Sequence, residues 1–400
     1  MVAGKHVVIG QSGGATAVIN ASLVGAIRAA KELAEVDGIY GARFGIQGVL
    51  EKQVLDLRRL APEVLEALRS TPSAALGSCR YRLQEGEARV AVANLESLGA
   101  GYFIYIGGND SADTGHQIAE AARDMGSSLR VIGVPKTIDN DLPDTDHCPG
   151  YGSAARFLAL AVTDSALCTE AMPSHYPVKI IEVMGRDAGW LAASTALGQS
   201  TPDDAPHLLY LPEYPINEEG FLTAVDEVYQ RLGYAVVVVA ETVRDEAGDP
   251  LGSAHSQGTD AFGHRLLGGA AQYLVGLVRE KLHIRARYEK PGDLQRMSSA
   301  CVSTVDRDEA EMVGAAAVGV AVSGQTDQMV TLVRRDGGVY GCDTGLTGLE
   351  QVANQQRPLP AAFVTADGRG VTAAFRRYAL PLLGESLPRP ARLGGPMVTW

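Results

Sequence analysis

Continuous runs of apolar, mostly β-branched residues alternate along this chain with segments of helical periodicity. Such runs are typical of strands buried on both faces, because a strand with one wet face alternates apolar and polar residues. Helical patterns between the runs, as at 20–36, supply the cover for both faces. The sequence therefore predicts an α/β fold with mostly parallel sheets. The predicted strands cover residues 6–10, 102–108, 129–135, 178–184, 207–212 and 234–241.

Length and composition exclude several classes of protein. Four hundred residues exceed the size at which one hydrophobic core usually stops growing, so we expect two domains. The formal net charge of −12 argues against nucleic-acid or acidic-membrane partners, because like charges repel. The five cysteines are scattered without CxxC spacing, and neither a disulfide framework nor a zinc site is expected. No apolar run reaches the roughly 18 residues needed to cross a bilayer, and we expect a cytoplasmic protein.

Polar clusters follow several of the predicted strands. In open parallel sheets, ligands bind beyond the carboxyl ends of the strands, where such clusters meet. The clusters lie at residues 12–16, 107–111, 135–141, 184–187 and 241. Their shared position is a stronger functional signal than any one motif, and it predicts a single site at this edge.

Two of the clusters are glycine turns between a strand and a helix. In "GQSGGATAVIN" (10–20), the glycines permit close backbone approach to an anion at a helix amino terminus. A plain structural turn explains this pattern equally well. In "YIGGNDSADT" (105–114), Asn109 and Asp110 follow the glycines, so a carboxylate occupies the place where an anion would dock. Asp110 has three interpretations: it spoils a phosphate site, holds a metal or excludes one particular ligand.

The segment "GVPKTIDND" (133–141) carries groups suited to phosphoryl transfer. An alcohol loses its proton as it attacks phosphorus, and a positioned aspartate such as Asp139 can accept that proton. Lys136 supplies a compact positive charge for phosphate oxygens. The alternative is an Asp-rich turn capped by its own side chains. Arg186, in "EVMGRDAGW", either stabilises a transferring phosphoryl group or pairs with a neighbouring acid.

In order along the chain, seven blocks resemble those of the phosphofructokinase family over most of residues 5–310. They are "SGGATAVIN", "LGSCRYR", "YIGGNDS", "PKTIDND", "EVMGR", "VVVVAE" and "GDLQR". The resemblance implies magnesium-dependent transfer of a phosphoryl group from ATP or pyrophosphate to the 1-hydroxyl of fructose 6-phosphate. It also implies a homodimer or homotetramer of two Rossmann-like three-layer domains with the active site in the cleft between them. The implied domains are 1–140 with the donor site, 141–283 with the sugar-phosphate site, and 284–400 crossing between both and ending in a tail.

The resemblance assigns roles to individual residues. It implies that Asp139 is the base, assisted by Arg186, Lys136 and Asp110, that Asn109 lies at the metal site, and that Asp141 supports the metal and base. The residues implied to bind the phosphoryl donor are Gly13, Arg80, Asp110 and Lys136. The residues implied to bind the sugar phosphate are Thr137, Asp139, Met184, Gly185, Arg186, Glu241, Arg287, Tyr288 and Arg296.

Two residues bear on the choice of donor. Pyrophosphate-using members of the family resemble this chain in carrying the aspartate at Asp110 and the lysine at Lys136. A carboxylate at Asp110 would crowd and repel the α-phosphate of a nucleotide, whereas Lys136 would neutralise pyrophosphate. The sequence thus predicts a pyrophosphate-dependent phosphofructokinase. The alternatives are an ATP-dependent 6-phosphofructokinase and a catalytically silent, ligand-sensing subunit.

The chain departs from the family pattern at three positions. Asn109 replaces the usual aspartate that helps place magnesium, and an amide without negative charge should bind the ion more weakly. Asp293 replaces a histidine found near the 6-phosphate in some members. Pro177 falls where many members supply an arginine across a subunit contact, with Lys179 nearby. The last two leave the acceptor open, including sedoheptulose 7-phosphate as an additional substrate.

Overall fold

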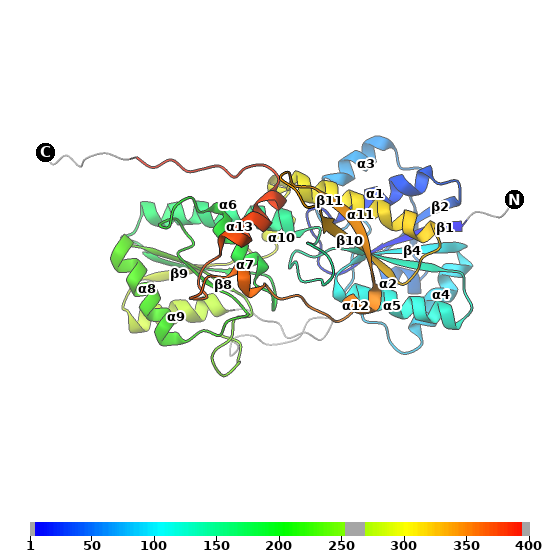
Figure 1. The fold of residues 1–400 in the computed structure, drawn as a ribbon. Coiled ribbons are helices and arrows are strands. Elements are labelled where there is room, and N and C mark those ends of the chain that lie inside the picture. The colour runs from blue at the N-terminus through cyan, green and yellow to red at the C-terminus, as the bar shows by residue number, and fades with distance from the viewer. Residues whose placement is uncertain (1–4, 253–268, 394–400) are drawn as a thin grey trace.

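The structure is a computed structural model that describes residues 5–252 and 269–393. It has two lobes side by side, each built around its own sheet (Figure 1). The strands are β1 (Lys5–Gln11), β2 (Val36–Ala42), β3 (Val54–Asp56), β4 (Ala100–Gly107), β5 (Arg130–Pro135), β6 (Val178–Val183), β7 (Leu208–Tyr210), β8 (Ala235–Ala240), β9 (Ala286–Glu289), β10 (Gln328–Arg334) and β11 (Cys342–Gly348). The helices are α1 (Ile19–Glu32), α2 (Ile46–Leu50), α3 (Pro62–Arg69), α4 (Glu87–Ser97), α5 (Asn109–Asp124), α6 (Tyr151–Ala171), α7 (Trp190–Ser194), α8 (Glu218–Leu232), α9 (Ala270–Lys281), α10 (Leu294–Met297), α11 (Thr304–Val322), α12 (Leu349–Val352) and α13 (Ala373–Ala379).

The first lobe contains a seven-stranded sheet in the order β11-β10-β5-β4-β1-β2-β3. The pairings from β10 through β5, β4 and β1 to β2 are parallel, whereas β3 and β11 join the two edges antiparallel. Alternate strand residues face opposite sides, so Val7 and Ile9 pack under α1, α3 and α11, while Val8 packs against α4 and α5. Because both faces are covered, the central strands read as continuous apolar runs.

The second lobe contains a four-stranded parallel sheet in the order β7-β8-β6-β9. Its core includes every residue of β8 and the buried faces of α6, α8 and α9. The carboxyl-terminal helix α13 packs on the same core through Phe375 and Ala379. The buried Trp190, at the start of α7, lies among Tyr151, Phe363 and Tyr378.

The two lobes are tied together where α6 begins. Asp306, on α11, accepts hydrogen bonds from the backbone amides of Gly150 (2.8 Å) and Ser153 (2.9 Å). These are the orphan amides of the amino terminus of α6, and a carboxylate there satisfies them and favours the helix dipole. The amino terminus of α6, in the second lobe, is therefore held by a carboxylate of the first lobe.

The predicted fold class is confirmed, and all six predicted strands are present within a residue or two of their expected limits. The helix predicted over 20–36 is shorter, because α1 ends at Glu32 and Val36 begins β2. Strands β2, β3, β9, β10 and β11 were not predicted. Within residues 5–252 and 269–393, no helix is both long and apolar enough to cross a membrane. Of the predicted tail, residues 394–400 lie outside the described residues.

Candidate active site

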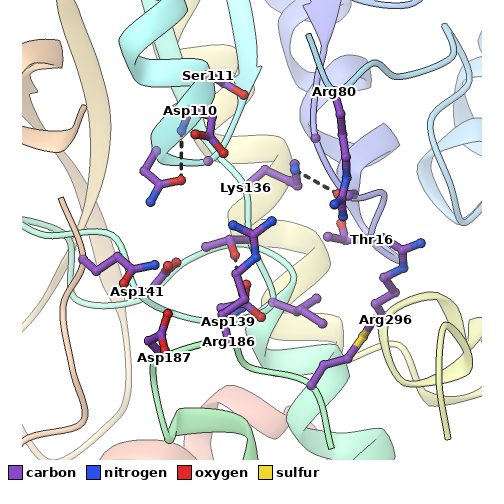
Figure 2. A pocket seen from close by; sticks show the side chains of 18 of the residues that line it. Thr16, Arg80, Asp110, Ser111, Lys136, Asp139, Asp141, Arg186, Asp187 and Arg296 are labelled. Carbon is purple, nitrogen blue, oxygen red and sulfur yellow. Dashed lines mark hydrogen bonds between the residues drawn. The ribbon is translucent and has the colours of Figure 1, made fainter. Parts of the chain in front are cut away.

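A cavity of about 470 Å³ lies where the two lobes meet. Loops from the first lobe form one wall, and the ends of β6 and β8 form the other, as predicted for the carboxyl ends of parallel strands. Figure 2 shows Arg80, Lys136 and Arg296 gathered on one side of it, with Asp139 and Arg186 facing them. The lining residues are Gly13, Gly14, Ala15, Thr16, Arg80, Gly108, Asn109, Asp110, Ser111, Lys136, Thr137, Ile138, Asp139, Asp141, Met184, Arg186, Asp187, Glu241, Thr242, Arg244, Arg296 and Gln356.

The glycine turn after β1 brings the backbone close to two cations. Gly13 has φ +76°, a left-handed conformation that glycine adopts without strain. A Cβ on Gly13 would lie 3.0 Å from Nζ of Lys136, and a Cβ on Gly14 would lie 2.8 Å from a guanidinium nitrogen of Arg296. Any side chain here would displace the cations, so the two glycines keep this corner open to an anion.

Lys136 is the central cation of this corner. It is 3% exposed, and its Nζ donates to the carbonyl oxygen of Gly14 at 2.8 Å. Burial lowers the pKa of Lys136 to about 8, and the nearby Arg296, Arg80 and Arg186 lower it further, against the opposing charge of Asp139. This corner of the cavity therefore gathers positive charge that an incoming polyanion would neutralise.

The carboxylates of the loop that connects β5 to α6 (residues 136–150), here called the base loop, lie on the opposite side of the cavity. Burial raises the pKa of Asp139, although Arg186 and Lys136 oppose this shift. The backbone amide of Asp139 donates to Oγ1 of Thr137 at 3.1 Å. Burial, together with the charge of Asp139, raises the pKa of Asp141 to about 7. A buried carboxylate with a raised pKa is suited to accept a proton near neutral pH.

The second wall of the cavity is built on the ends of β6 and β8. Arg186 has φ +48°, and its backbone is bound by the two residues that follow β8: its amide donates to Oε1 of Glu241 at 3.4 Å, and its carbonyl accepts from Oγ1 of Thr242. Burial, with a further effect from the charge of Asp139, raises the pKa of Glu241 to about 7. Gln295, on α10, accepts from the amide of Met184 at 3.1 Å, which places α10 and Arg296 next to β6.

Helix α5 begins at the cavity with Asn109 and Asp110. Oδ1 of Asn109 accepts from the amide of Asp110 at 2.9 Å, which satisfies one orphan donor of the helix. Nδ2 of Asn109 donates to the carbonyl oxygen of Gln355 at 3.4 Å. An aspartate could not make this second bond, because an ionised carboxylate only accepts. The asparagine thus links α5 to a segment 246 residues further along the chain.

The donor set near α5 fits magnesium shared with substrate phosphates. Mg²⁺ usually binds one or two protein oxygens and takes its remaining ligands from phosphates and water. The carboxylate of Asp110 and the amide oxygen of Asn109 line the cavity here, and a carbonyl oxygen has two lone pairs, of which Asn109 uses one. In the described part of the chain, no group of three or more His, Cys, Asp or Glu residues could hold a metal. The site therefore does not resemble a dedicated all-protein metal centre.

Most of the predicted site residues meet at this cavity. Among the described residues that line it, those predicted are Gly13, Arg80, Asn109, Asp110, Lys136, Thr137, Asp139, Met184, Arg186, Glu241 and Arg296, and Asp141 joins them. Gly185, Arg287 and Tyr288 are not in the lining. Gly185 lies between two lining residues, whereas the other two lie on the edge strand β9.

The residues around β9 form ion pairs outside the cavity. Nη2 of Arg287 lies 2.7 Å from Glu289, and Nζ of the buried Lys179 lies 3.2 Å from the same carboxylate. Lys179 therefore does not reach the cavity in place of an arginine at Pro177. Asp293 lies 2.9 Å from Arg296 and restrains the guanidinium that lines the cavity.

Sequence reasoning missed a second group of lining residues. Thr16, Ser111 and Asp187 belong to clusters that the sequence singled out, but they received no role there. Arg244 and Gln356 carried no signal, because each lies in an irregular segment that reaches the cavity only after folding. Arg244 pairs with Asp187 at 3.2 Å at the cavity edge. The lining residues missed by the sequence analysis are Gly14, Ala15, Thr16, Gly108, Ser111, Ile138, Asp187, Thr242, Arg244 and Gln356.

The two-lobed α/β fold, with buried carboxylates facing clustered cations across an interlobe cavity, defines an enzyme of phosphorylated substrates. The phosphofructokinase family model matches residues 6–321, and the chain belongs to this family. It is 43% identical over 399 residues to pyrophosphate–fructose 6-phosphate 1-phosphotransferase of Rhodospirillum rubrum, covering 98% of this chain and 97% of that one. It is 33% identical to sulfofructose kinase of Alkalicoccus urumqiensis, over 90% of this chain and 92% of that one.

A solved structure agrees with these sequence comparisons. The pyrophosphate-dependent phosphofructokinase from Marinobacter aquaeolei superimposes with a TM-score of 0.86 at 36% identity, covering 98% of this chain and 95% of that one. The predicted family resemblance is therefore confirmed, and the similarity extends beyond residue 310, where the sequence blocks end.

Proposed function

We propose that this chain is a pyrophosphate-dependent phosphofructokinase, which reversibly transfers a phosphoryl group from pyrophosphate to the 1-hydroxyl of fructose 6-phosphate. The observation that carries the proposal is that Asp110 and Lys136 both line the donor side of the cavity. Lys136 supplies buried positive charge for a compact polyanion, and Asp110 supplies a carboxylate where a longer donor would extend. Relatives that are 37–43% identical over nearly the full chain are named pyrophosphate–fructose 6-phosphate 1-phosphotransferases, and these names support pyrophosphate as the donor and fructose 6-phosphate as the acceptor.

In the proposed reaction, Asp139 accepts the proton of the 1-hydroxyl as that oxygen attacks the near phosphorus of pyrophosphate. A new oxygen–phosphorus bond forms, the bridging bond of pyrophosphate breaks, and inorganic phosphate leaves. Arg186 and Lys136 stabilise the negative charge that spreads over the transferring group and the leaving phosphate. Because Asp139 is buried and its pKa is raised, it is a stronger base than an exposed aspartate.

The donor is held by the glycine turn together with Lys136 and Arg80. Gly13 and Gly14 leave room for the phosphate oxygens beside Lys136, and Arg80 completes the positive side. When bound near Asp110 and Asn109, Mg²⁺ supplies positive charge that neutralises and orients pyrophosphate. Asp110 excludes ATP, since its carboxylate would crowd and repel the α-phosphate.

The acceptor lies against the second wall. Arg296 binds the 6-phosphate, Glu241 accepts from a sugar hydroxyl, and Thr137, Met184 and Gly185 shape the pocket around the reacting end. Glu241 is suited to this because it lines the cavity in a buried position, where water competes less for a hydrogen bond. The 1-hydroxyl then points toward Asp139, on the far side of the same cavity.

We further propose a homodimer or homotetramer, in which Arg287 and Tyr288 bind the sugar phosphate of a neighbouring subunit. Tyr288 is 47% exposed on the edge strand β9, and Leu294 and Tyr176, at 67% and 43%, are exposed large hydrophobic residues of the same lobe. An exposed apolar group rimmed by charges favours a protein contact. Sedimentation equilibrium tests the assembly, and a monomer at all concentrations would refute it.

A donor and acceptor matrix tests the function. Purified protein with magnesium is given pyrophosphate or ATP, and for each donor the acceptor is fructose 6-phosphate, sedoheptulose 7-phosphate or sulfofructose. We expect formation of fructose 1,6-bisphosphate with pyrophosphate, and the reverse reaction with phosphate. Turnover with ATP but not pyrophosphate would refute the donor, turnover of another sugar in preference to fructose 6-phosphate would refute the acceptor, and no turnover at all would indicate a silent subunit.

A further inference from the structure

The chain segment Gln355–Arg357 lies along one edge of the cavity and contacts both sides of it. The carbonyl oxygen of Gln355 accepts from Nδ2 of Asn109, at the start of α5, and Gln356 lines the cavity. The backbone amide of Arg357 donates to the carbonyl oxygen of Asp141 at 2.7 Å. Three consecutive residues from a carboxyl-terminal segment therefore touch the donor side, the cavity and the base loop.

The side chain of Arg357 binds the backbone of the base loop at several points. Nη2 donates to the carbonyl of Asn140 at 2.9 Å, and Nη1 donates to the carbonyls of Thr145 and Asp146. The guanidinium also stacks 4.8 Å from the ring of Trp190, in the second lobe. Since these hydrogen bonds go to backbone carbonyls, Arg357 fixes the path of the loop rather than the position of any one side chain.

Tyr378, on α13, completes the hold on Asn140. Its hydroxyl accepts from Nδ2 of Asn140 at 3.0 Å and donates to the carbonyl of Asp146 at 2.8 Å. The remaining amide atom of Asn140, Oδ1, accepts from the backbone amide of Cys148 at 2.9 Å. Both polar atoms of the Asn140 side chain are thus hydrogen-bonded, and Asn140 is not among the residues that line the cavity.

The conformation of Asn140 explains why such a hold is needed. Asn140 lies between Asp139 and Asp141 with φ +56°, in the left-handed region that asparagine tolerates better than most residues but still at a cost. This turn directs both neighbouring carboxylates into the cavity while the asparagine side chain points away from it. Without its bonds, the loop would relax toward ordinary backbone angles and carry Asp139 with it.

We propose that Arg357 and Tyr378 are positioning residues, which hold the base loop so that Asp139 reaches the 1-hydroxyl of the acceptor. The inference rests on the proposed function and adds to it a role for the carboxyl-terminal segment. Neither side chain lines the cavity, so both act through Asn140 and its neighbours. Misplacement of a reacting group by about 1 Å can cost on the order of a hundredfold in rate, whereas distant binding contacts are left in place.

The central experiment compares Tyr378→Phe with Tyr340→Phe by steady-state kinetics and thermal unfolding. Both tyrosines stack on Arg334, with ring centroids 4.7 and 5.0 Å from it, and each hydroxyl is hydrogen-bonded. The hydroxyl of Tyr340 donates to Glu309 at 2.6 Å and does not contact Asn140, so its loss is a matched structural control.

We expect Tyr378→Phe to lower kcat by about tenfold, with the KM for each substrate close to that of the wild type, because only the base is displaced. Tyr340→Phe is expected to lower the unfolding temperature with kcat retained. Arg357→Lys keeps the charge but loses the planar fork, and should lower kcat in the same manner as Tyr378→Phe.

An unchanged kcat in Tyr378→Phe and Arg357→Lys would overturn the proposal, and so would equal losses of kcat in Tyr378→Phe and Tyr340→Phe, which would indicate a purely structural role. The wild-type protein separates this failure from failure of the proposed function. If the wild type shows no pyrophosphate-dependent turnover, the function is wrong, whereas an active wild type with fully active variants refutes only the positioning role.

Discussion

The ammonium of Lys136 lies 2.8 Å from the carbonyl oxygen of Gly14, so a lysine at the end of β5 is bound to the glycine turn that follows β1. The two strands are separated by β4 in the sheet, and their ends meet only at its carboxyl edge. The single hydrogen bond leaves the other two ammonium protons of Lys136 to bind a donor phosphate. The charge state of this one lysine should therefore control donor binding.

We expect kcat/KM for pyrophosphate to fall as the pH rises through about 8, because burial and neighbouring arginines lower the pKa of Lys136 to that value in the free protein. Lys136→Arg should keep its charge, so its alkaline decline should shift to higher pH even if its overall rate is lower. The measurement is a pH profile of both proteins from pH 6 to pH 10, roughly the range that spans the lysine ionisation.

Pyrophosphate itself ionises in this pH range, but its ionisation affects kcat/KM of both proteins equally and therefore cancels when the two profiles are compared. Identical alkaline limbs in the wild type and Lys136→Arg would show that Lys136 does not control the profile.

Asp139→Asn should lower kcat by about 10³-fold, within the range observed for loss of a general base, because an amide cannot accept the proton. Binding of fructose 6-phosphate should stay measurable by calorimetry, since Arg296 and Glu241 are unchanged. Asp164→Asn, on an exposed position of α6, is the matched control and should be fully active. Normal turnover by Asp139→Asn would remove Asp139 from the role of base.

Asp110→Gly should admit ATP, with affinity rising by at least about tenfold, equivalent to about 1.4 kcal/mol. Asp110→Asn separates charge from size, because it removes the repulsion and keeps the volume, and it should give a smaller gain. Direct binding of ATP is measured for the wild type and both variants. If neither variant binds ATP more tightly than the wild type, the steric and charge account of donor choice fails.

The sequence predicts a strand correctly where the burial of that strand in the fold is reflected in its own run of residues. Strands buried on both faces carry continuous apolar runs, and β1, β4, β5, β6 and β8 were found in this way. By contrast, β11 reads "CDTGLTG", a mixture of polar residues and glycines in which Cys342 alone is buried, because an edge strand needs no apolar side chain on its wet face. Its pairing with β10 depends on tertiary contact, which no short window of sequence contains.

The same distinction holds for the active site. The "TIDND" and "MGR" loops could be predicted because each follows its own strand and carries its own chemistry. The segment Gln355–Arg357 could not, since its effect is to bind residues more than 200 positions away through backbone groups. Asn109 illustrates the consequence: its amide looked like a weakened metal ligand, but in the fold it also donates to Gln355, which an aspartate could not do.

Glu241→Gln should stabilise the protein at pH 8 and have little effect near pH 4. Burial and the charge of Asp139 raise the pKa of Glu241 from 4.5 to about 7, so the folded state favours the neutral carboxyl. The stability associated with that neutral form is fully present below pH 4.5 and is lost as the pH rises through 7. The loss at pH 8 is on the order of 3 kcal/mol, and glutamine, which does not ionise, avoids it.

Thermal and denaturant unfolding at pH 4 and pH 8 measure this difference, with Glu219→Gln in the first turn of α8 as the matched control for the same substitution. The amide oxygen of the replacement side chain can still accept from the backbone amide of Arg186, so the fold should be retained. Catalytic efficiency with fructose 6-phosphate should fall, because the amide binds a sugar hydroxyl less strongly than a carboxylate does. A stabilisation that is equal at both pH values would show that Glu241 is ionised at little cost in the folded protein. Burial would then not raise the pKa of the Glu241 carboxyl.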